Sequence, residues 1–131
     1  MIADSSAWVE FLRGTGSSVA QRLGRAIRDG EELLMPDVVY QEVLQGAASP
    51  TGFMRLQAQL DSVHAYIPDD PREIAQQAAL LYARCRWQGI TLRSPNDCLI
   101  AACALEADIP LLHADRDFVR LAQIDNRLRF A

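Results

Sequence analysis

Acidic residues follow or flank four separate apolar segments of this 131-residue chain. Asp4 follows Met-Ile-Ala, and Glu42 lies on a helical stretch after Leu-Leu-Met-Pro. Asp97 opens the most apolar helix, whereas Asp115 and Asp117 follow Ile-Pro-Leu-Leu-His-Ala. In an open α/β sheet, residues just beyond the carboxyl ends of strands meet in one crevice. Because gathered carboxylates repel one another unless a cation neutralises them, this pattern predicts a divalent metal site and phosphate chemistry.

The chemistry of such a site follows from its oxygen ligands. Mg²⁺ prefers oxygen and uses only one or two carboxylates directly, a requirement that Asp4 and Asp97 would meet. The bound cation would lower the pKa of a water molecule and stabilise charge on a phosphoryl oxygen. The alternative for each acid is structural: Asp97 also suits a helix start, where it stabilises the helix dipole. Asp115 and Asp117 equally suit a turn and the first turn of a helix.

The basic residues are all arginine: there are thirteen, and the chain has no lysine. The absence of lysine excludes P-loop, Schiff-base and receiver-domain chemistry. A net charge of −4 argues against coating nucleic acid by bulk attraction, but it permits local phosphate contacts from arginine. Arg93 and Arg116 flank Asp97 and Asp115, so they are predicted to bind substrate phosphates or to hold the carboxylates. The alternative is a surface ion pair of little energetic value.

Helices and short strands alternate along the chain, which predicts a single α/β/α domain over residues 1–131 with a short-stranded, mainly parallel sheet. The periodicity of apolar residues and the Gly and Pro positions define the elements. The predicted strands are 1–4, 33–35, 64–67, 109–113 and an edge strand at 128–130. The predicted helices are 5–13, 17–29, 36–45, 50–60, 71–87, one beginning at 94–97, and 118–121.

Several other side chains admit two readings. Arg84 and Arg86 near Trp87 form either an RNA-stacking surface or, as we favour, an exposed helix edge with Trp87 half-buried. His113 is either a general base or, as we favour, a packed and hydrogen-bonded residue. An exposed apolar face for a partner helix is also predicted, from Phe53, Met54, Leu56 and Leu60.

The three cysteines, Cys85, Cys98 and Cys103, are odd in number and lack metal-binding spacing, so we expect buried thiols in a reducing compartment. The longest apolar stretch, 98–105, is too short to span a membrane. Acidic residues within the first ten positions argue against a signal peptide. We therefore expect a cytoplasmic protein without membrane contacts.

Four motifs, in order along the chain, resemble those of PIN-domain ribonucleases, most closely the VapC toxins of bacterial toxin–antitoxin pairs. The first is Asp-Ser-Ser-Ala-Trp-Val-Glu-Phe-Leu-Arg-Gly at 4–14. The second is Val-Tyr-Gln-Glu-Val-Leu-Gln-Gly at 39–46. The others are Arg-Ser-Pro-Asn-Asp-Cys-Leu-Ile-Ala-Ala at 93–102 and His-Ala-Asp-Arg-Asp-Phe at 113–118. Each motif alone is weak, but together they are specific.

The resemblance implies a Mg²⁺-dependent endoribonuclease, with Mn²⁺ as a possible substitute, that hydrolyses RNA through metal-activated water. Its substrate would be tRNA or rRNA, and its partners a second copy of the chain and a cognate antitoxin. The implied acidic site comprises Asp4, Glu42, Asp97 and Asp115.

Within that site, Asp4 and Asp97 are the expected direct metal ligands, while Glu42 and Asp115 position water or a second ion. Asp117 is a possible further carboxylate, although we prefer Asp115 as the working acid because it lies nearer the strand end. Ser6 would orient Asp4, and Asn96 would support the site.

Two alternative functions remain. A catalytically weak PIN-like module would bind RNA or a protein without turnover. A phosphatase that forms an aspartyl-phosphate would need a second Asp after the first strand and usually a lysine. Asp4-Ser5-Ser6 lacks that Asp, and the chain lacks lysine, so this alternative is unfavoured.

Overall fold

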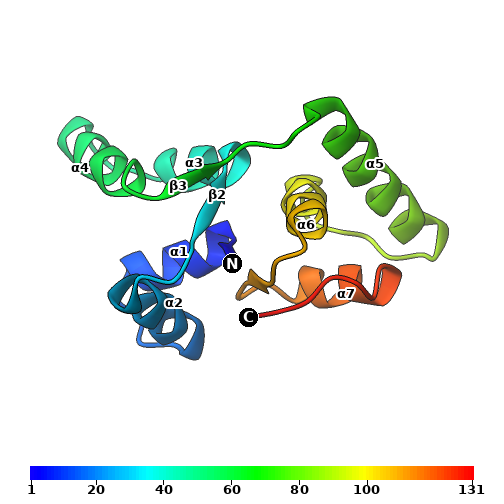
Figure 1. Ribbon diagram of the computed structural model, residues 1–131, viewed down its shortest axis with the longest axis horizontal. Coiled ribbons are helices and arrows are strands. Elements are labelled where there is room, and N and C mark those ends of the chain that lie inside the picture. The colour runs from blue at the N-terminus through cyan, green and yellow to red at the C-terminus, as the bar shows by residue number, and fades with distance from the viewer.

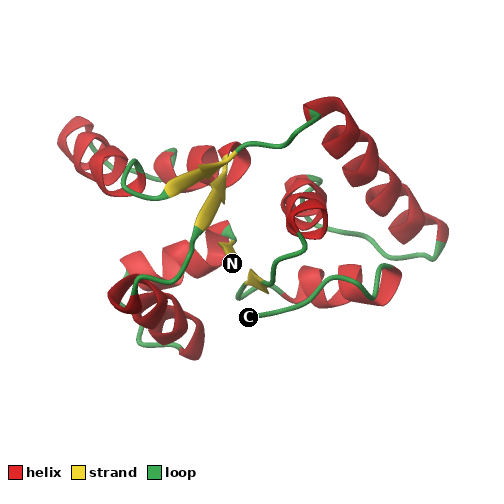
Figure 2. Ribbon diagram, in the orientation of Figure 1, coloured by secondary structure: helices red, strands yellow, loops and turns green.

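Four very short strands form one parallel sheet in the computed structural model, which describes residues 1–131 (Figure 2). The strand order is β3-β2-β1-β4, so β1 lies between β2 and β4. Ile2 pairs with Leu34 on one side and with Leu111 on the other. The strands are β1 (Ile2–Ala3), β2 (Leu34–Pro36), β3 (His64–Tyr66) and β4 (Leu111–Leu112).

Seven helices surround this sheet, which confirms the α/β/α prediction. Figure 1 shows α1 and α2 on one side of the strands and α5, α6 and α7 on the other. The helices are α1 (Ser5–Leu12), α2 (Ser18–Asp29), α3 (Asp37–Leu44), α4 (Pro50–Leu60), α5 (Pro71–Trp87), α6 (Asn96–Ala107) and α7 (Arg116–Ile124). No helix is both long enough and apolar enough to cross a membrane.

The helix boundaries follow from side chains that satisfy free backbone groups. Ser17 caps α2 by accepting from the Ala20 N–H, and α2 ends at Gly30, whose φ of 68° suits a residue without Cβ. Asp4, rather than either of the two serines that follow it, caps α1. Because the Asp4 carboxylate accepts the Ala7 N–H at 3.0 Å, it leaves both serine hydroxyls free for other contacts.

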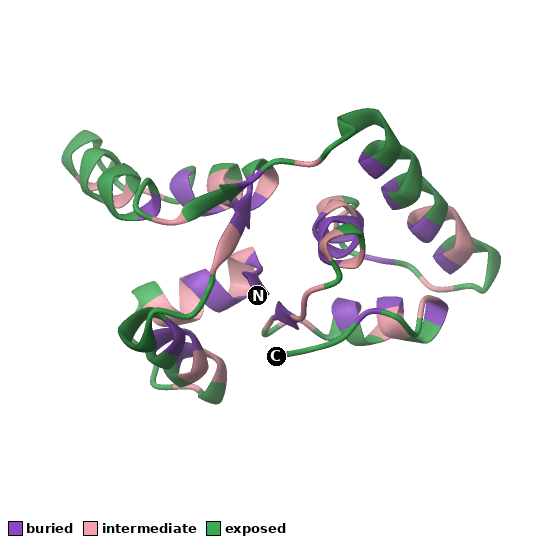
Figure 3. Ribbon diagram, viewed as in Figure 1, coloured by how far each residue is buried: buried purple, intermediate pink, exposed green.

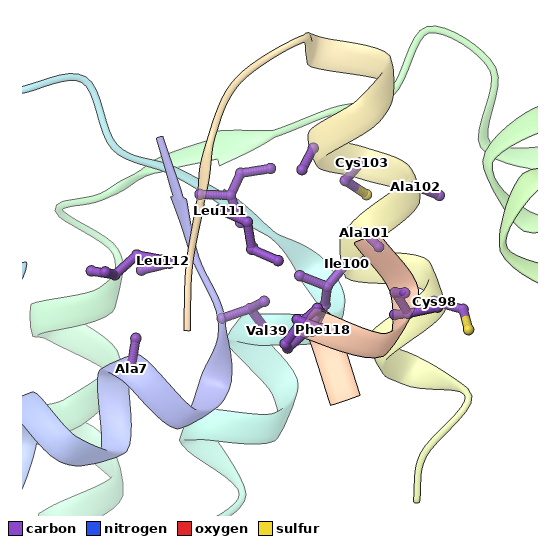
Figure 4. Close-up of a cluster of buried hydrophobic side chains, with 14 of the residues drawn as sticks. Ala7, Val39, Cys98, Ile100, Ala101, Ala102, Cys103, Leu111, Leu112 and Phe118 are labelled. Atoms are coloured by element: carbon purple, nitrogen blue, oxygen red, sulfur yellow. The ribbon is translucent and has the colours of Figure 1, made fainter. Parts of the chain in front are cut away.

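The core is built around the sheet and α6 and also takes in buried residues of α1, α2, α3, α5 and α7. Seven residues of α6 are buried, six of them apolar and the seventh Asp97, so this helix is not amphipathic. Figure 4 shows its Ile100 and Ala101 beside Phe118 of α7 and Leu111 of β4. All three cysteines are buried free thiols, as predicted. By contrast, α4 is mostly exposed (Figure 3).

The C-terminal elements differ from the sequence-based prediction in length. The helix expected at 118–121 begins at Arg116 and runs to Ile124, because Asp115 caps it. The expected strand at 128–130 is reduced to a single parallel bridge between Leu111 and Phe130. Two hydrogen bonds, from the Leu111 N–H to the Arg129 oxygen and from the Ala131 N–H to the Leu111 oxygen, make this bridge.

Candidate metal centre

The acidic residues gather where the strand order changes direction. From β1 the chain adds β2 and β3 on one side of the sheet, and β4 pairs on the other side. Such a switch point leaves a crevice at the carboxyl ends of the two diverging strands. Asp4 directly follows β1, and its N–H donates to the Leu112 oxygen at the end of β4 at 2.9 Å. The loop after β4 carries Asp115, so both acids stand at one edge of the sheet.

Four of the acids also stand at helix N-termini, where the dipole favours negative charge. Asp4 is the N-cap of α1 and Asp115 is the N-cap of α7. Asp97 lies in the first turn of α6 and Asp117 in the first turn of α7. The fold therefore aims the positive ends of three helix dipoles at the cluster, which offsets part of the repulsion between its carboxylates.

Asp4 is buried and firmly held. The Ser6 hydroxyl lies 2.7 Å from Asp4 Oδ1 and 2.9 Å from Oδ2 and donates to this carboxylate. The same hydroxyl accepts the Ala114 N–H at 2.9 Å, which ties α1 to the loop after β4. Burial raises the pKa of Asp4 to about 6, against the lowering effect of the Ser6 and Ala7 hydrogen bonds. Ser6 therefore occupies the position expected of a residue that orients Asp4.

The surroundings of Asp97 show that the protein does not neutralise the negative charge of the acidic cluster there. Its side chain is only 8% exposed and makes no hydrogen bond. Burial, followed by the negative charges of Asp115, Asp4, Asp117 and Glu42, raises the pKa of Asp97 to about 7. The other four predicted carboxylates therefore lie close enough to Asp97 to act on it electrostatically.

Asp115 and Asp117 are engaged by arginine. Arg93 Nη2 lies 2.7 Å from Asp115 Oδ1, and the Arg93 N–H donates to Asp117 Oδ2 at 3.1 Å. Arg120, which the sequence analysis did not single out, lies 3.3 Å from Asp117 Oδ1. Burial alone would raise the pKa of Asp115, but the Asp117 N–H and the Arg93 guanidinium outweigh it and the pKa is lowered. Arg93 thus pairs with both carboxylates while its side chain is 68% exposed, and its role toward substrate stays a prediction.

The donor set fits a hard divalent cation. One carboxylate oxygen from each of Asp97, Asp115 and Asp117 lies within 4.8 Å of the other two. Oxygen donors in this number suit Mg²⁺ or Mn²⁺ rather than a thiophilic metal. Both Asp117 oxygens already accept hydrogen bonds, whereas Asp115 Oδ2 is unengaged. This difference favours Asp115 over Asp117 as a direct ligand.

Glu42 joins the cluster from α3 with a partner that the sequence analysis missed. The Ser5 hydroxyl donates to Glu42 Oε1 at 2.8 Å. No local pattern in the sequence links Ser5 to a residue 37 positions away. Ser5 and Ser6 thus each hold one acid of the site, and both become available because Asp4 itself caps α1.

The remaining predicted residues lie beside the cluster. His113 packs against Phe130 and Phe118, with ring centroids 4.4 and 5.3 Å away, and its Nδ1 accepts the Asp115 N–H. This is the packed, hydrogen-bonded reading of His113, and burial lowers its pKa. Arg116 is exposed at the start of α7 and forms no ion pair, and the Asn96 side chain makes no hydrogen bond. Their predicted roles stay predictions.

Comparison with known proteins shows which family this chain belongs to. The family model of the PIN domain matches residues 1–124. "VapC ribonuclease Mb1587" of Mycobacterium bovis and "Ribonuclease VapC11" of Mycobacterium tuberculosis are each 34% identical to this chain over 127 residues, which cover 96% of this chain and 94% of the relative. The chain belongs to the PIN domain family, among the VapC proteins.

Two solved structures share the fold at low sequence identity. FitAcB from Neisseria gonorrhoeae superposes with a TM-score of 0.71 at 17% identity, covering 99% of this chain and 96% of that chain. VapBC2 from Rickettsia felis, bound to a DNA fragment from its promoter, gives a TM-score of 0.70 at 15% identity with the same coverage. These two structures confirm the fold. The family model and the 34%-identical relatives confirm the resemblance noted in the sequence.

Proposed function

We propose that this protein is a metal-dependent endoribonuclease and the toxin of a toxin–antitoxin pair. The observation that carries the proposal is the convergence of five carboxylates at the β1/β4 edge, with the pKa of Asp97 raised to about 7 by burial and by its acidic neighbours. Such an arrangement is costly without a cation. The names of the 34%-identical relatives, which are ribonucleases, support RNA as the substrate class.

Each residue has a distinct part in the proposed reaction. Asp4 and Asp97 would hold Mg²⁺ or Mn²⁺, with Asp115 Oδ2 as a further oxygen donor. A bound divalent cation supplies a more acidic water and charge stabilisation at a phosphoryl oxygen. Glu42, held at Oε1 by Ser5, keeps Oε2 to orient the attacking water. The exposed Arg116 guanidinium at the rim suits a substrate phosphate.

The test is RNA cleavage by the purified protein. We expect shortening of tRNA or rRNA with Mg²⁺ or Mn²⁺ and none in EDTA. Asp4→Asn and Asp97→Asn should each lower the rate by roughly 100-fold or more, the scale of losing one group that stabilises the transition state. Asp37→Asn is the matched control, because Asp37 is an exposed first-turn acid of α3. Undiminished cleavage by both site variants would refute the proposal, and RNA binding without shortening would favour a binding module.

A protein partner and a second copy of the chain complete the proposal. One solved neighbour, VapBC2, is a complex, and this supports a cognate antitoxin for this chain. We expect the protein encoded beside this gene to co-purify with it and to abolish RNA cleavage at a one-to-one ratio. Light scattering of the protein alone should give twice the 14.6 kDa chain mass. A monomer mass at micromolar concentration would remove the homodimer from the proposal.

A further inference from the structure

The C-terminal half of α5 and the loop after it carry positive charge without any acid. Between Ile74 and Asn96 there are three arginines and no Asp or Glu, in a chain whose net charge is −4. Arg84 donates to the Ile124 oxygen and so ties α5 to α7. Arg93 holds the acidic cluster. Arg86 forms no hydrogen bond or ion pair, so its guanidinium is available to a ligand.

Beside Arg86 lies an open aromatic groove. Trp87 is 74% exposed, contrary to the half-buried position expected from the sequence, because it is the last residue of α5. Tyr82, Ala83, Arg86 and Trp87 line a groove of about 310 Å³. The other tryptophan, Trp8, is 5% exposed and belongs to the core. An exposed indole beside a free guanidinium offers a flat stacking surface and a phosphate donor side by side.

The groove is connected to the acidic site by a short, anchored loop. The chain reverses after α5 at Gly89, where φ is 76°, and the Ile90 N–H donates to the Cys85 oxygen at 2.8 Å. The loop then packs along α7, where Arg120 donates to the Thr91 oxygen. It ends at Arg93, on the carboxylate of Asp115. Figure 1 shows this loop running from the end of α5 back toward α6.

Chain geometry limits how far apart the two sites can lie. Trp87 and Arg93 are six positions apart in the chain, so their Cα atoms are at most about 22 Å apart. A single strand of RNA with its scissile phosphate at the carboxylates could therefore reach the groove within a few nucleotides. Both ends of this path carry arginine.

We propose that the groove of Tyr82, Ala83, Arg86 and Trp87 binds an unpaired base of the RNA substrate. Trp87 stacks on the base and Arg86 binds the neighbouring phosphate. Charge complementarity favours RNA over a protein helix as the occupant, because the surface is aromatic and cationic. Most exposed aliphatic and sulfur side chains lie elsewhere, such as Met54 on α4 and Ile67 after β3, and the exposed aliphatic residue on α5 is Leu80, 45% exposed. This inference rests on the proposed ribonuclease function and specifies how its substrate is held.

Steady-state cleavage of a single-stranded RNA in Mg²⁺ tests the stacking contact. Trp87→Ala should raise KM by roughly 5- to 100-fold, the range for losing one base–aromatic stack, and leave kcat within about twofold. Trp87→Phe should restore most of the loss because it keeps a ring. Ile67→Ala, which truncates a 79%-exposed apolar side chain after β3, is the matched control and should leave KM unchanged.

Tryptophan emission gives a second, direct readout. Because Trp87 is the exposed tryptophan, single-stranded RNA should quench wild-type emission, and Trp87→Phe should remove that response while Trp8 emission remains. Active wild type with an unchanged KM in Trp87→Ala would overturn the groove proposal and leave the ribonuclease proposal standing. Inactive wild type would instead defeat the ribonuclease proposal. Loss of the co-purifying partner or of the dimer in Trp87→Ala, with KM unchanged, would assign the groove to protein contacts and overturn the inference.

Discussion

At the residue scale, Asp97 and Asp117 are buried acids of one cluster with opposite surroundings. Asp97 has no hydrogen-bond partner and faces four other carboxylates. Asp117, 1% exposed, accepts from Arg93 and Arg120. The charge on Asp97 therefore opposes folding in the metal-free protein, whereas the hydrogen bonds to Asp117 support it.

Replacing each acid by its amide should separate the two roles. In EDTA at pH 7.5, Asp97→Asn should raise the free energy of unfolding by about 1–3 kcal/mol, because it removes an ionised group whose folded-state pKa is about 7. Asp117→Asn should lower it by about 2 kcal/mol, because hydrogen bonds to charged groups are lost. Urea denaturation measures both. A destabilised Asp97→Asn would contradict the account of its environment.

The stabilisation by Asp97→Asn should depend on pH with a defined sign. Folding raises the pKa of Asp97 from 3.8 to about 7. The stability that the protonated Asp97 contributes to the wild-type protein is therefore fully present below pH 4 and is lost as the pH rises through 7. The difference in unfolding free energy between Asp97→Asn and wild type should therefore grow from pH 4 to pH 7 and level off above pH 8. A difference that is constant across this range would show that the raised pKa is wrong.

Metal binding should make the ionised Asp97 stabilising instead of destabilising, because a cation competes with protons for the same carboxylate oxygens. Mn²⁺ at 100 times its Kd should raise the unfolding free energy of the wild type by about 2.7 kcal/mol. The gain should be larger at pH 7.5 than at pH 5.5 and largely absent in Asp97→Asn. Thermal denaturation with and without Mn²⁺ measures it, and an equal gain in wild type and Asp97→Asn would place the ion elsewhere.

At the element scale, two serines join α1 to the rest of the site. Ser6 links Asp4 to the loop between β4 and α7, and Ser5 links α1 to Glu42 of α3. These contacts hold the Asp4 carboxylate, the Glu42 carboxylate and the loop that carries Asp115 in fixed positions relative to one another. They connect positions that are 37 and 108 residues apart along the chain.

Ser6→Ala should therefore affect both stability and the site. Loss of its hydrogen bonds to Asp4 and Ala114 should cost about 1–2 kcal/mol. It should also raise the pKa of Asp4 further, because the Ser6 hydroxyl favours the ionised form. Ser6→Thr keeps the hydroxyl and should therefore retain most of the stability and RNA-cleaving activity of the wild type. Ser18→Ala, at an exposed position in the first turn of α2, is the control.

At the scale of the whole molecule, charge is distributed unevenly. Residues 1–70 contain five arginines and ten acids, whereas residues 71–131 contain eight arginines and seven acids. The proposed RNA binding must therefore depend on a few local arginines of the second half rather than on bulk attraction.

The dependence of RNA binding on salt should consequently be weak. For a single strand, each phosphate contact makes the slope of log K against log salt concentration more negative by about 0.7. We therefore expect a slope of about −1 to −3. Arg86→Gln should reduce its magnitude by about 0.7. Fluorescence titrations between 50 and 300 mM KCl measure the slope. A slope near −6 would require a broad basic surface that this chain does not have.

The sequence by itself determined the parallel α/β/α fold, most helix boundaries, the family and the acids that gather at one edge of the sheet. The local signals in the sequence are the periodicity of apolar residues, caps such as Ser17 and Gly30, and the four ordered motifs. Such signals can be recognised without knowledge of the tertiary structure. Tertiary structure alone decided what each acid touches. Arg120 on Asp117, Ser5 on Glu42 and the exposure of Trp87 depend on how distant elements pack, and no periodicity or motif encodes such contacts. The pKa of Asp97 depends on the same packing, because burial and the mutual distance of carboxylates exist only once β1, β4, α3 and α6 have met.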